Sequence, residues 1–389
     1  MSRFWLSIGG SYVALAIAGS VALHPAIAAA QGRVAADTVV VSSLAPKNAL
    51  PNEAASAGVT KFSFVTYGDT RGRHDGFELQ AEHTLVIESM IATIRKAATT
   101  ADPIRFVVQS GDAVQNGAIG AQWAVSYVPL INRLTQDGGV PYFLSVGNHD
   151  VGNAVDLADK RRVDGLKNYF TANAKLIPPE GSPRRLNGYP TFAFGYGNSF
   201  FIAFDSDIPD DSTQLAWVQS QLEGLDRKRY VNISLFFHHP PFSSGPHGGA
   251  KLERQAASIR AKWMPLIRKH HVRLLLTGHE HLFEHWVERY ADASGQYRID
   301  EIVSGGGGAP LYAYTGEPDV SAYVAGGAAE KVSLQHLVRP AIEAGANPFH
   351  YVVVHVDGTK ISLEVVAVDW GKGFAPYRSN IASLVDVTP

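Results

Sequence analysis

The chain has 389 residues, 46% of them apolar, which is enough for a large hydrophobic core. Its 34 basic and 36 acidic side chains leave a net charge of −2, which excludes a broadly basic nucleic-acid-binding protein and an acidic tail protein. Because cysteine is absent, the sequence also excludes disulfides, iron–sulfur clusters, thiolate zinc sites and a cysteine nucleophile.

The first thirty residues have the pattern of a secretory signal peptide. Arg3 is the only charged residue before Arg33, an apolar stretch runs from 4 to 23, and residues 26–30 are Ala-Ile-Ala-Ala-Ala. We expect cleavage after Ala30 and an exported chain, periplasmic or secreted. The alternative is a retained membrane anchor, because this stretch is nearly long enough to span a bilayer. No later apolar segment is long enough to span a bilayer, so we expect no membrane span after signal removal.

Beyond the signal, the sequence predicts one folded domain with two flanking segments. Residues 31–58 are rich in Ala, Ser, Pro and Val without periodicity, and we expect a flexible leader there. The domain is predicted over 59–372, and the C-terminal tail over 373–389.

Apolar strands alternate with amphipathic helices along this domain. Its first half predicts, in order, a strand at 61–67, a helix at 78–98, a strand at 104–110, a helix at 123–134 and a strand at 141–146. Its second half predicts a hairpin over 191–205, a helix at 214–225, a strand at 232–237, a helix at 254–269, strands at 273–277 and 299–304, and a hairpin of 351–356 with 360–368. This alternation predicts a layered α/β fold.

Five of these strands end in polar side chains of the metal-ligand type, namely Asp69, Asp112, Asn148, His238 and the pair His279 and His281. In open α/β sheets ligands bind at the carboxyl ends of strands, so we expect these side chains to meet at one edge. Any one of these motifs alone is more often a turn or a loop end. The prediction of a metal site therefore depends on all of them occurring together and in this order. So many ligands exceed one tetrahedral zinc and suit two divalent ions that share a carboxylate.

The ordered motifs resemble those of the calcineurin-like metallophosphoesterase superfamily, which includes purple acid phosphatases and metal-dependent phosphodiesterases. They are Gly68-Asp69, Gly111-Asp112-x4-Gly117, Gly147-Asn148-His149-Asp150, His238-His239-Pro240 and Gly278-His279-x-His281. The resemblance covers about residues 60–310. It implies a four-layered α/β/β/α sandwich with the metal site at the carboxyl ends of strands, and it says little about the substrate.

The resemblance also implies a role for each motif residue. The ligands would divide into Asp112 as the bridge, Asp69 and His281 for the first ion, and Asn148, His238 and His279 for the second. His149 would face the substrate, where it stabilises the transition state or protonates the leaving group. His239 and Asp150 are interpreted as structural or orienting residues.

Two positions depart from the family pattern. Many members have a metal-binding His where this chain has Arg71, and arginine cannot be an ordinary ligand. We expect Arg71 either to grip a phosphate oxygen or to form a salt bridge beside the site, and the first ion to be held more weakly. Gln115 replaces the Tyr of purple acid phosphatases and the Asp of protein phosphatases. It predicts a protein without the purple colour of a tyrosinate–iron site and argues against a standard Ser/Thr protein phosphatase.

Loops between the motifs are expected to set specificity, namely 151–190, 243–249 and 310–347. His247 is a candidate substrate contact or simply a surface histidine. Tyr312 could stack on the substrate or belong to a small loop core.

The sequence therefore supports the hypothesis of an exported hydrolase that acts on phosphate mono- or diesters by direct attack of a metal-bound hydroxide. Its cofactors would be two divalent ions, and Mn, Zn and Fe all suit these ligands. We expect a small phosphate ester as substrate and no long nucleic acid, because a basic excess is missing. The alternative is a catalytically silent metal- or phosphate-binding protein on the same fold, which Arg71 motivates. The oligomeric state is not predicted.

Overall fold

The computed structural model describes residues 39–72, 76–249, 251–369 and 373–376. The expected signal peptide at 1–30 lies outside these residues, as does 377–389 of the expected C-terminal tail. Within the described ranges, no helix combines the length and the apolar character that crossing a bilayer requires.

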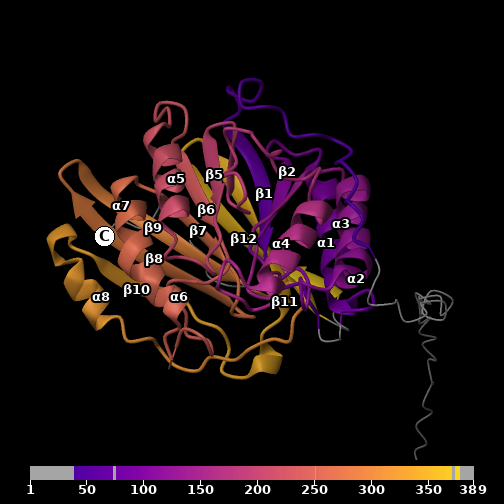
Figure 1. The fold of residues 1–389 in the computed structure, drawn as a ribbon. Coiled ribbons are helices and arrows are strands. Elements are labelled where there is room, and N and C mark those ends of the chain that lie inside the picture. Colours follow the sequence, from indigo (N-terminus) through magenta and orange to yellow (C-terminus); the bar gives the residue numbers. More distant parts are fainter. Residues whose placement is uncertain (1–38, 73–75, 250, 370–372, 377–389) are drawn as a thin grey trace, which may run out of the picture. The chain divides into compact units, whose positions relative to one another are not determined.

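Two β-sheets form the centre of the fold (Figure 1). The first has the order β13-β12-β11-β1-β2-β3. Its strands are β1 (Lys61–Tyr67), β2 (Ile104–Gln109), β3 (Tyr142–Leu144), β11 (Phe349–Asp357), β12 (Lys360–Asp369) and β13 (Gly373–Pro376). Strands β1, β2 and β3 are parallel, so their carboxyl ends lie at one edge of the sheet, while β11, β12 and β13 pair antiparallel.

The second sheet has the order β10-β8-β9-β7-β6-β5-β4. Its strands are β4 (Phe192–Tyr196), β5 (Ser199–Ala203), β6 (Asn232–Phe236), β7 (Leu274–Thr277), β8 (Phe283–Asp292), β9 (Gly295–Ser304) and β10 (Ser333–Val338). Strands β5, β6, β7 and β9 are parallel, and β4, β8 and β10 add antiparallel edges. The carboxyl ends of β6 and β7 therefore also share an edge.

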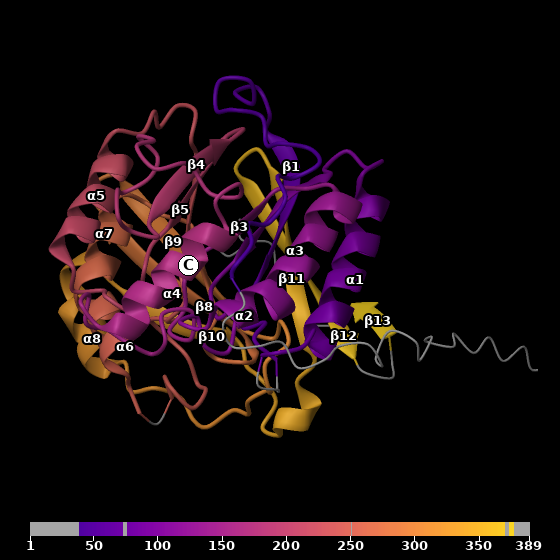
Figure 2. The same ribbon diagram turned by 45° about the vertical axis from the view of Figure 1, so that its right-hand side comes forward.

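Helices cover the outer faces of the two sheets (Figures 1 and 2). On the first sheet lie α1 (Ala81–Ala97) and a helical run of α2 (Gly120–Gln122), η1 (Trp123–Tyr127), α3 (Val128–Arg133) and η2 (Leu134–Gly138). On the second lie α5 (Ser212–Glu223) and a run of α6 (Arg254–Ser258), η3 (Ile259–Trp263) and α7 (Met264–Lys269). Further helices are α4 (Lys160–Ala172) and α8 (Ser321–Gly326), with short turns η4 (Ala328–Glu330) and η5 (Ala344–Ala346). The predicted α/β/β/α sandwich is confirmed.

Aromatic side chains hold the two sheets together. The ring of Phe106 on β2 lies edge-on to those of Phe194 and Phe201, with ring centroids 5.3 and 5.1 Å apart. Phe64 on β1 contacts Phe201 in the same way at 5.1 Å. Such pairs add to the burial of large apolar surfaces, so the sheets form one rigid support for the strand ends.

Strand β8 and helix α4 are the main elements that the sequence did not predict. In β8 the polar side chains of Glu284, His285 and Glu288 are buried. Buried polar side chains hide the alternation of apolar and polar residues on which strand prediction depends. Helix α4 has an apolar stripe too sparse for a periodic signal, although Asp159 caps its first turn by accepting a hydrogen bond from the Arg161 N–H.

The described part of the expected flexible leader, residues 39–58, contacts the domain. Arg184 donates hydrogen bonds of 2.7 and 2.8 Å to Glu53, and the hydroxyl of Tyr230 donates one of 2.9 Å. At the other end, β13 pairs with β12 although the tail was expected to begin at 373. These contacts support a folded domain that begins before residue 59 and continues to Pro376, which we propose as its extent.

Candidate metal centre

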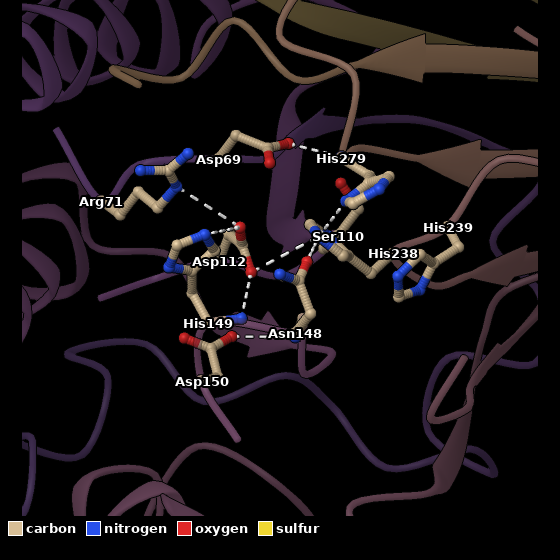
Figure 3. Close-up of polar contacts among 12 residues, drawn as sticks. Asp69, Arg71, Ser110, Asp112, Asn148, His149, Asp150, His238, His239 and His279 are labelled. Atoms are coloured by element: carbon tan, nitrogen blue, oxygen red, sulfur yellow. Dashed lines mark hydrogen bonds and ion pairs between the residues drawn. The ribbon is translucent and has the colours of Figure 1, made fainter. Parts of the chain in front are cut away.

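The carboxyl ends of β1, β2, β6 and β7 converge beside a cavity of about 550 Å³. Its lining includes six of the residues expected at the site, namely Arg71, Asp112, Asn148, His149, His279 and His281. Asp69 and His238 are fully buried beside them (Figure 3). The structure thus brings all eight expected site residues together, although they are spread over more than two hundred positions of the chain.

Asp112 lies at the centre of this group. Its Oδ1 accepts a hydrogen bond of 2.9 Å from the His149 N–H and lies 3.4 Å from His238 Nε2, while its Oδ2 lies 3.5 Å from Arg71 Nε. Burial alone would raise the pKa of Asp112, but its electrostatic interactions with His238, His149 and Arg71 outweigh burial and lower the pKa. Asp112 is therefore an ionised carboxylate whose two oxygens face different sides of the site.

One set of ligand atoms converges around His238. Its Nε2 lies 2.9 Å from Asn148 Oδ1 and 3.1 Å from His279 Nδ1. Its Nδ1 lies 2.9 Å from the Ser110 carbonyl, to which only an N–H can donate, so Nε2 keeps its lone pair. His279 faces Glu253 with its Nε2 at 3.0 Å, which leaves Nδ1 as the lone-pair nitrogen. Two lone-pair nitrogens so close together fit a shared cation.

A second set surrounds Asp69. His281 Nε2 lies 3.4 Å from Asp69 Oδ1, and His281 Nδ1 donates a 2.6 Å hydrogen bond to the Pro310 carbonyl. Among the described residues, Asp69 Oδ1 is buried without a hydrogen-bond partner. Burial raises the pKa of Asp69 to about 7, and the nearby Asp112 charge adds to this rise. An unpartnered buried carboxylate oxygen beside an imidazole lone pair also fits a cation.

The two residues that depart from the family pattern contact each other. Arg71 Nη1 donates a 2.8 Å hydrogen bond to Gln115 Oε1, and Arg71 also pairs with Asp112 and lines the cavity. Burial and the charge of Arg71 lower the pKa of His281 to about 3. A permanent positive charge therefore lies next to the ligand atoms expected to hold the first ion.

The remaining motif residues are fixed by hydrogen bonds. His149 Nδ1 donates to the Gln115 carbonyl at 2.7 Å, which leaves Nε2 directed to the site, 3.9 Å from Asp112 Oδ2. Asp150 accepts hydrogen bonds from the N–H groups of Gly147 and Ala113, both at 2.9 Å, and so holds together the loops after β2 and β3. His239 is buried with its Nδ1 2.9 Å from Ser206 Oγ.

Sequence reasoning missed Glu253, which lines the cavity. Its two carboxylate oxygens lie 3.0 Å from His279 Nε2 and 2.8 Å from His247 Nδ1. Burial opposes its ionisation, yet the hydrogen bonds from both histidines lower the pKa of Glu253. It also belongs to a group with His239 and His279 whose ligand atoms lie within 4.8 Å of one another. No local motif marks Glu253, because it stands alone before a short helix.

The backbone explains why glycines precede the expected ligands. Asp69, Asp112 and His279 have positive φ angles of 61°, 55° and 68°, so the chain turns sharply where each strand ends. A Cβ at Gly147 would lie 2.4 Å from Asp112 Oδ1, and one at Gly278 would lie 2.4 Å from Asp69 Oδ2. Only glycine allows the neighbouring backbone to approach these carboxylates so closely.

The chain is similar to known proteins over part of its length. The family model of calcineurin-like phosphoesterases matches residues 85–283. Among curated proteins, probable purple acid phosphatase 20 of Arabidopsis thaliana is 26% identical over 178 residues, which cover 44% of this chain and 39% of that one. Purple acid phosphatase 18 of Arabidopsis thaliana is 23% identical over 145 residues, covering 37% and 30%. These matches span less than half the length of either relative.

Among solved structures, the chain is similar to a purple acid phosphatase isolated from yellow lupin (Lupinus luteus) seeds. The TM-score is 0.56 with 16% sequence identity, and the match covers 86% of this chain and 54% of that one. This likeness shows a common fold.

Proposed function

Because the chain belongs to the calcineurin-like phosphoesterase family, we propose that it is a metal-dependent phosphoesterase that hydrolyses mono- or diesters of small molecules. The observation that carries the proposal is the convergence of two carboxylates, one amide oxygen and three imidazoles on one cavity. The chain spans only part of its curated relatives, so its activity rests on this geometry and on the family.

Two divalent ions fit the ligand atoms that the structure describes, with Asp112 shared between two groups. Asn148, His238 and His279 would hold one ion, and Asp69 with His281 the other. Bound ions would lower the pKa of a water molecule and neutralise charge on the phosphate oxygens. Nitrogen and oxygen ligands suit Mn, Zn or Fe.

Arg71 makes the two ion positions unequal. Its guanidinium stands where many family members have a further ligand, 3.5 Å from Asp112 Oδ2. A fixed positive charge repels a cation at the Asp69 and His281 position, so we propose that this ion is bound more weakly. The same charge at the cavity wall would attract a phosphate oxygen.

His149 would support the reaction beside Arg71, because both side chains lie at the same oxygen of Asp112, Oδ2, at 3.9 and 3.5 Å. The Gln115 carbonyl fixes its Nδ1 as a donor, so Nε2 faces the cavity and can bind or release a proton. An N–H there would donate to a phosphate oxygen or protonate the leaving group.

The test is a hydrolysis assay with p-nitrophenyl phosphate and bis-p-nitrophenyl phosphate, with Mn, Zn and Fe supplied separately. We expect metal-dependent release that a chelator abolishes and that falls by a factor of about 100 or more in Asp112→Asn, because the shared carboxylate loses its charge. The preferred ester gives the class of substrate. Bound ions without release on any ester would instead favour a metal- or phosphate-binding protein, which the Arg71 replacement also permits.

We also propose that the chain is exported, on the basis of the signal-peptide pattern of residues 1–30, which lie outside the described residues. Expression of the full chain in a Gram-negative host should give a product in the periplasm or medium whose N-terminal residue is Gln31. A product that starts at Met1 and stays with the membrane fraction would support the retained anchor.

A further inference from the structure

Glu253 reaches the candidate metal centre from the N-terminal end of helix α6. It is the N-cap residue, with extended backbone angles of −72° and 155°, yet its side chain makes no capping hydrogen bond among the described residues. The carboxylate instead turns to the site, where Oε2 accepts from His279 Nε2 at 3.0 Å and Oε1 accepts from His247 Nδ1 at 2.8 Å. The side chain at the N-cap position, where Ser, Thr, Asp or Asn usually caps the helix, is here directed to the site.

The loop that carries Glu253 is anchored to the second sheet by buried carboxyl groups. The Ser244 N–H donates to Glu284 Oε1 at 2.8 Å, and the His247 N–H donates to Glu280 Oε1 at 2.7 Å. Both acceptors are fully buried. Glu253 is therefore presented to His279 from a loop that is fixed at several points.

His279 differs from the other histidines of the centre in the hydrogen-bond partner of the ring nitrogen that points away from the candidate ion. His238, His149 and His281 each face a backbone carbonyl with Nδ1, at 2.9, 2.7 and 2.6 Å. Among the four, only His279 directs the nitrogen that points away from the site at a carboxylate, that of Glu253. A carboxylate fixes the proton on Nε2, directs the Nδ1 lone pair to the site and makes the imidazole a stronger ligand than a carbonyl does.

We infer that Glu253 is a positioning residue that fixes the tautomer and orientation of His279 for binding the ion shared with Asn148 and His238. The inference rests on the proposed function, because it presupposes an ion at that position. Glu253 acts through His279, and it does so independently of its second contact with His247.

The nearby group of His239, Glu253 and His279 offers another role, in which Glu253 itself binds an ion. The hydrogen bonds of Ser206 argue against it. Ser206 Oγ accepts from the N–H groups of His238 and His239, at 3.2 and 2.9 Å, so its hydrogen is directed to His239 Nδ1. Neutral His239 then carries its proton on Nε2, the nitrogen that would have to bind the ion.

The experiment is a zinc titration of the metal-free chain in competition with a chromophoric chelator. The variants are Glu253→Gln, Glu253→Ala and the control His247→Gln, which removes the second contact of Glu253 together with the ring contact of His247 with His279 (centroids 4.5 Å apart) but leaves the Glu253–His279 hydrogen bond. We expect Glu253→Ala to weaken one zinc ion by a factor of about 10–100, the usual effect of losing such a partner. Glu253→Gln should lose less, because its amide oxygen still accepts from His279 Nε2, and His247→Gln should bind zinc like the parent.

Thermal unfolding of the metal-free variants separates positioning from folding. If Glu253→Ala lowers this stability, the comparison of Glu253→Gln with His247→Gln decides the matter. Equal zinc binding by the parent and both Glu253 variants would overturn the inference alone. The inference would also be overturned if the parent bound a third zinc ion that only the Glu253 variants lost. Glu253 would then itself be a ligand of that ion. A parent chain that binds no zinc would instead refute the metal centre and the proposed function.

Discussion

At the scale of single residues, Arg71 and Gln115 change the character of the centre together. They lie 44 positions apart, and their 2.8 Å hydrogen bond fixes the guanidinium between the Asp112 carboxylate and the cavity. Of the two roles considered for Arg71, the salt bridge is present in the structure, and the place of Arg71 in the cavity wall leaves phosphate binding open to test.

Arg71→Gln should therefore have two opposite effects. We expect kcat/KM for p-nitrophenyl phosphate to fall by a factor of about 10–100, the value of a hydrogen bond to a charged group. The affinity of the weaker ion should rise, because a like charge is removed. Steady-state kinetics and a zinc titration measure both. A guanidinium that serves only as a salt bridge would leave kcat/KM unchanged once the ions are saturating.

His149→Asn tests which of its two roles His149 performs. If Nε2 protonates the leaving group, kcat for an alkyl phosphate should fall by a factor of about 100 or more, because an alkoxide is a poor leaving group. The loss for p-nitrophenyl phosphate should be much smaller, since p-nitrophenolate leaves without a proton. Equal losses on both esters would assign His149 to stabilising charge on the phosphate.

At the scale of elements, the site depends on sharp turns at strand ends. The ligand-type residues Asp69 and Asp112 follow glycines directly, and both have left-handed backbone conformations. Parallel strands bring these turns to one edge of a sheet, and the packing of the two sheets brings the second pair of strand ends beside the first. The strain at each turn is tolerated because the surrounding sheets are rigid.

Gly147→Ala should damage the centre while the fold persists. Its Cβ would lie 2.4 Å from Asp112 Oδ1 and 2.9 Å from His238 Nδ1, so both side chains must shift. We expect weaker zinc binding and a loss of about 1–3 kcal/mol in unfolding free energy. The control is Gly326→Ala at the end of α8, where a Cβ meets nothing within 4 Å, and zinc binding there should equal that of the parent. Unaltered zinc binding by Gly147→Ala would contradict the close packing described here.

At the scale of the whole molecule, buried histidines outside the centre link stability to pH. Burial lowers the pKa of His83 to about 3, and those of His336 and His350 to about 4. In the unfolded chain a histidine has a pKa near 6.5, so the unfolded state binds protons first as the pH falls. Each of these histidines therefore contributes stability that is complete above about pH 6.5 and is lost progressively towards pH 4. Burial raises the pKa of Glu284 to about 7, so its contribution to stability has the opposite pH dependence and is lost as the pH rises.

Because these contributions oppose each other, the prediction concerns variants compared with the parent. The unfolding free energy of the parent should decrease when the pH is lowered from 7 to 5. In His350→Gln this decrease should be smaller by about 2 kcal/mol. His355→Gln should behave in the opposite way. A hydrogen bond to Glu364 raises the pKa of His355, which therefore stabilises the fold at low pH and loses that effect as pH rises. Urea unfolding of the metal-free chain at both pH values measures these differences. Identical pH dependence in the parent and both variants would refute this account.

The sequence by itself determined the order of most strands and helices, a layered α/β fold and the candidate ligands, and its resemblance to a known family added the α/β/β/α arrangement. The strand predicted at 61–67 has those bounds in the structure, because hydrophobic runs and turn glycines are local signals. The same local signals failed for β8, whose buried polar side chains depend on partners elsewhere in the chain. The sequence therefore predicts where each motif begins and ends, but not which side chains from other parts of the chain contact it.

Only the tertiary structure decided which side chains meet. The contact of Arg71 with Gln115 and that of Glu253 with His279 join residues 44 and 26 positions apart on different elements. Neither pair lies within one sequence motif. A hydrogen bond between two packed elements requires only that their backbones bring suitable side chains close together, and this leaves no local pattern in the sequence. The distribution of charge around the candidate ions is therefore a property of the fold, whereas the ligand types were already fixed by residues at the strand ends.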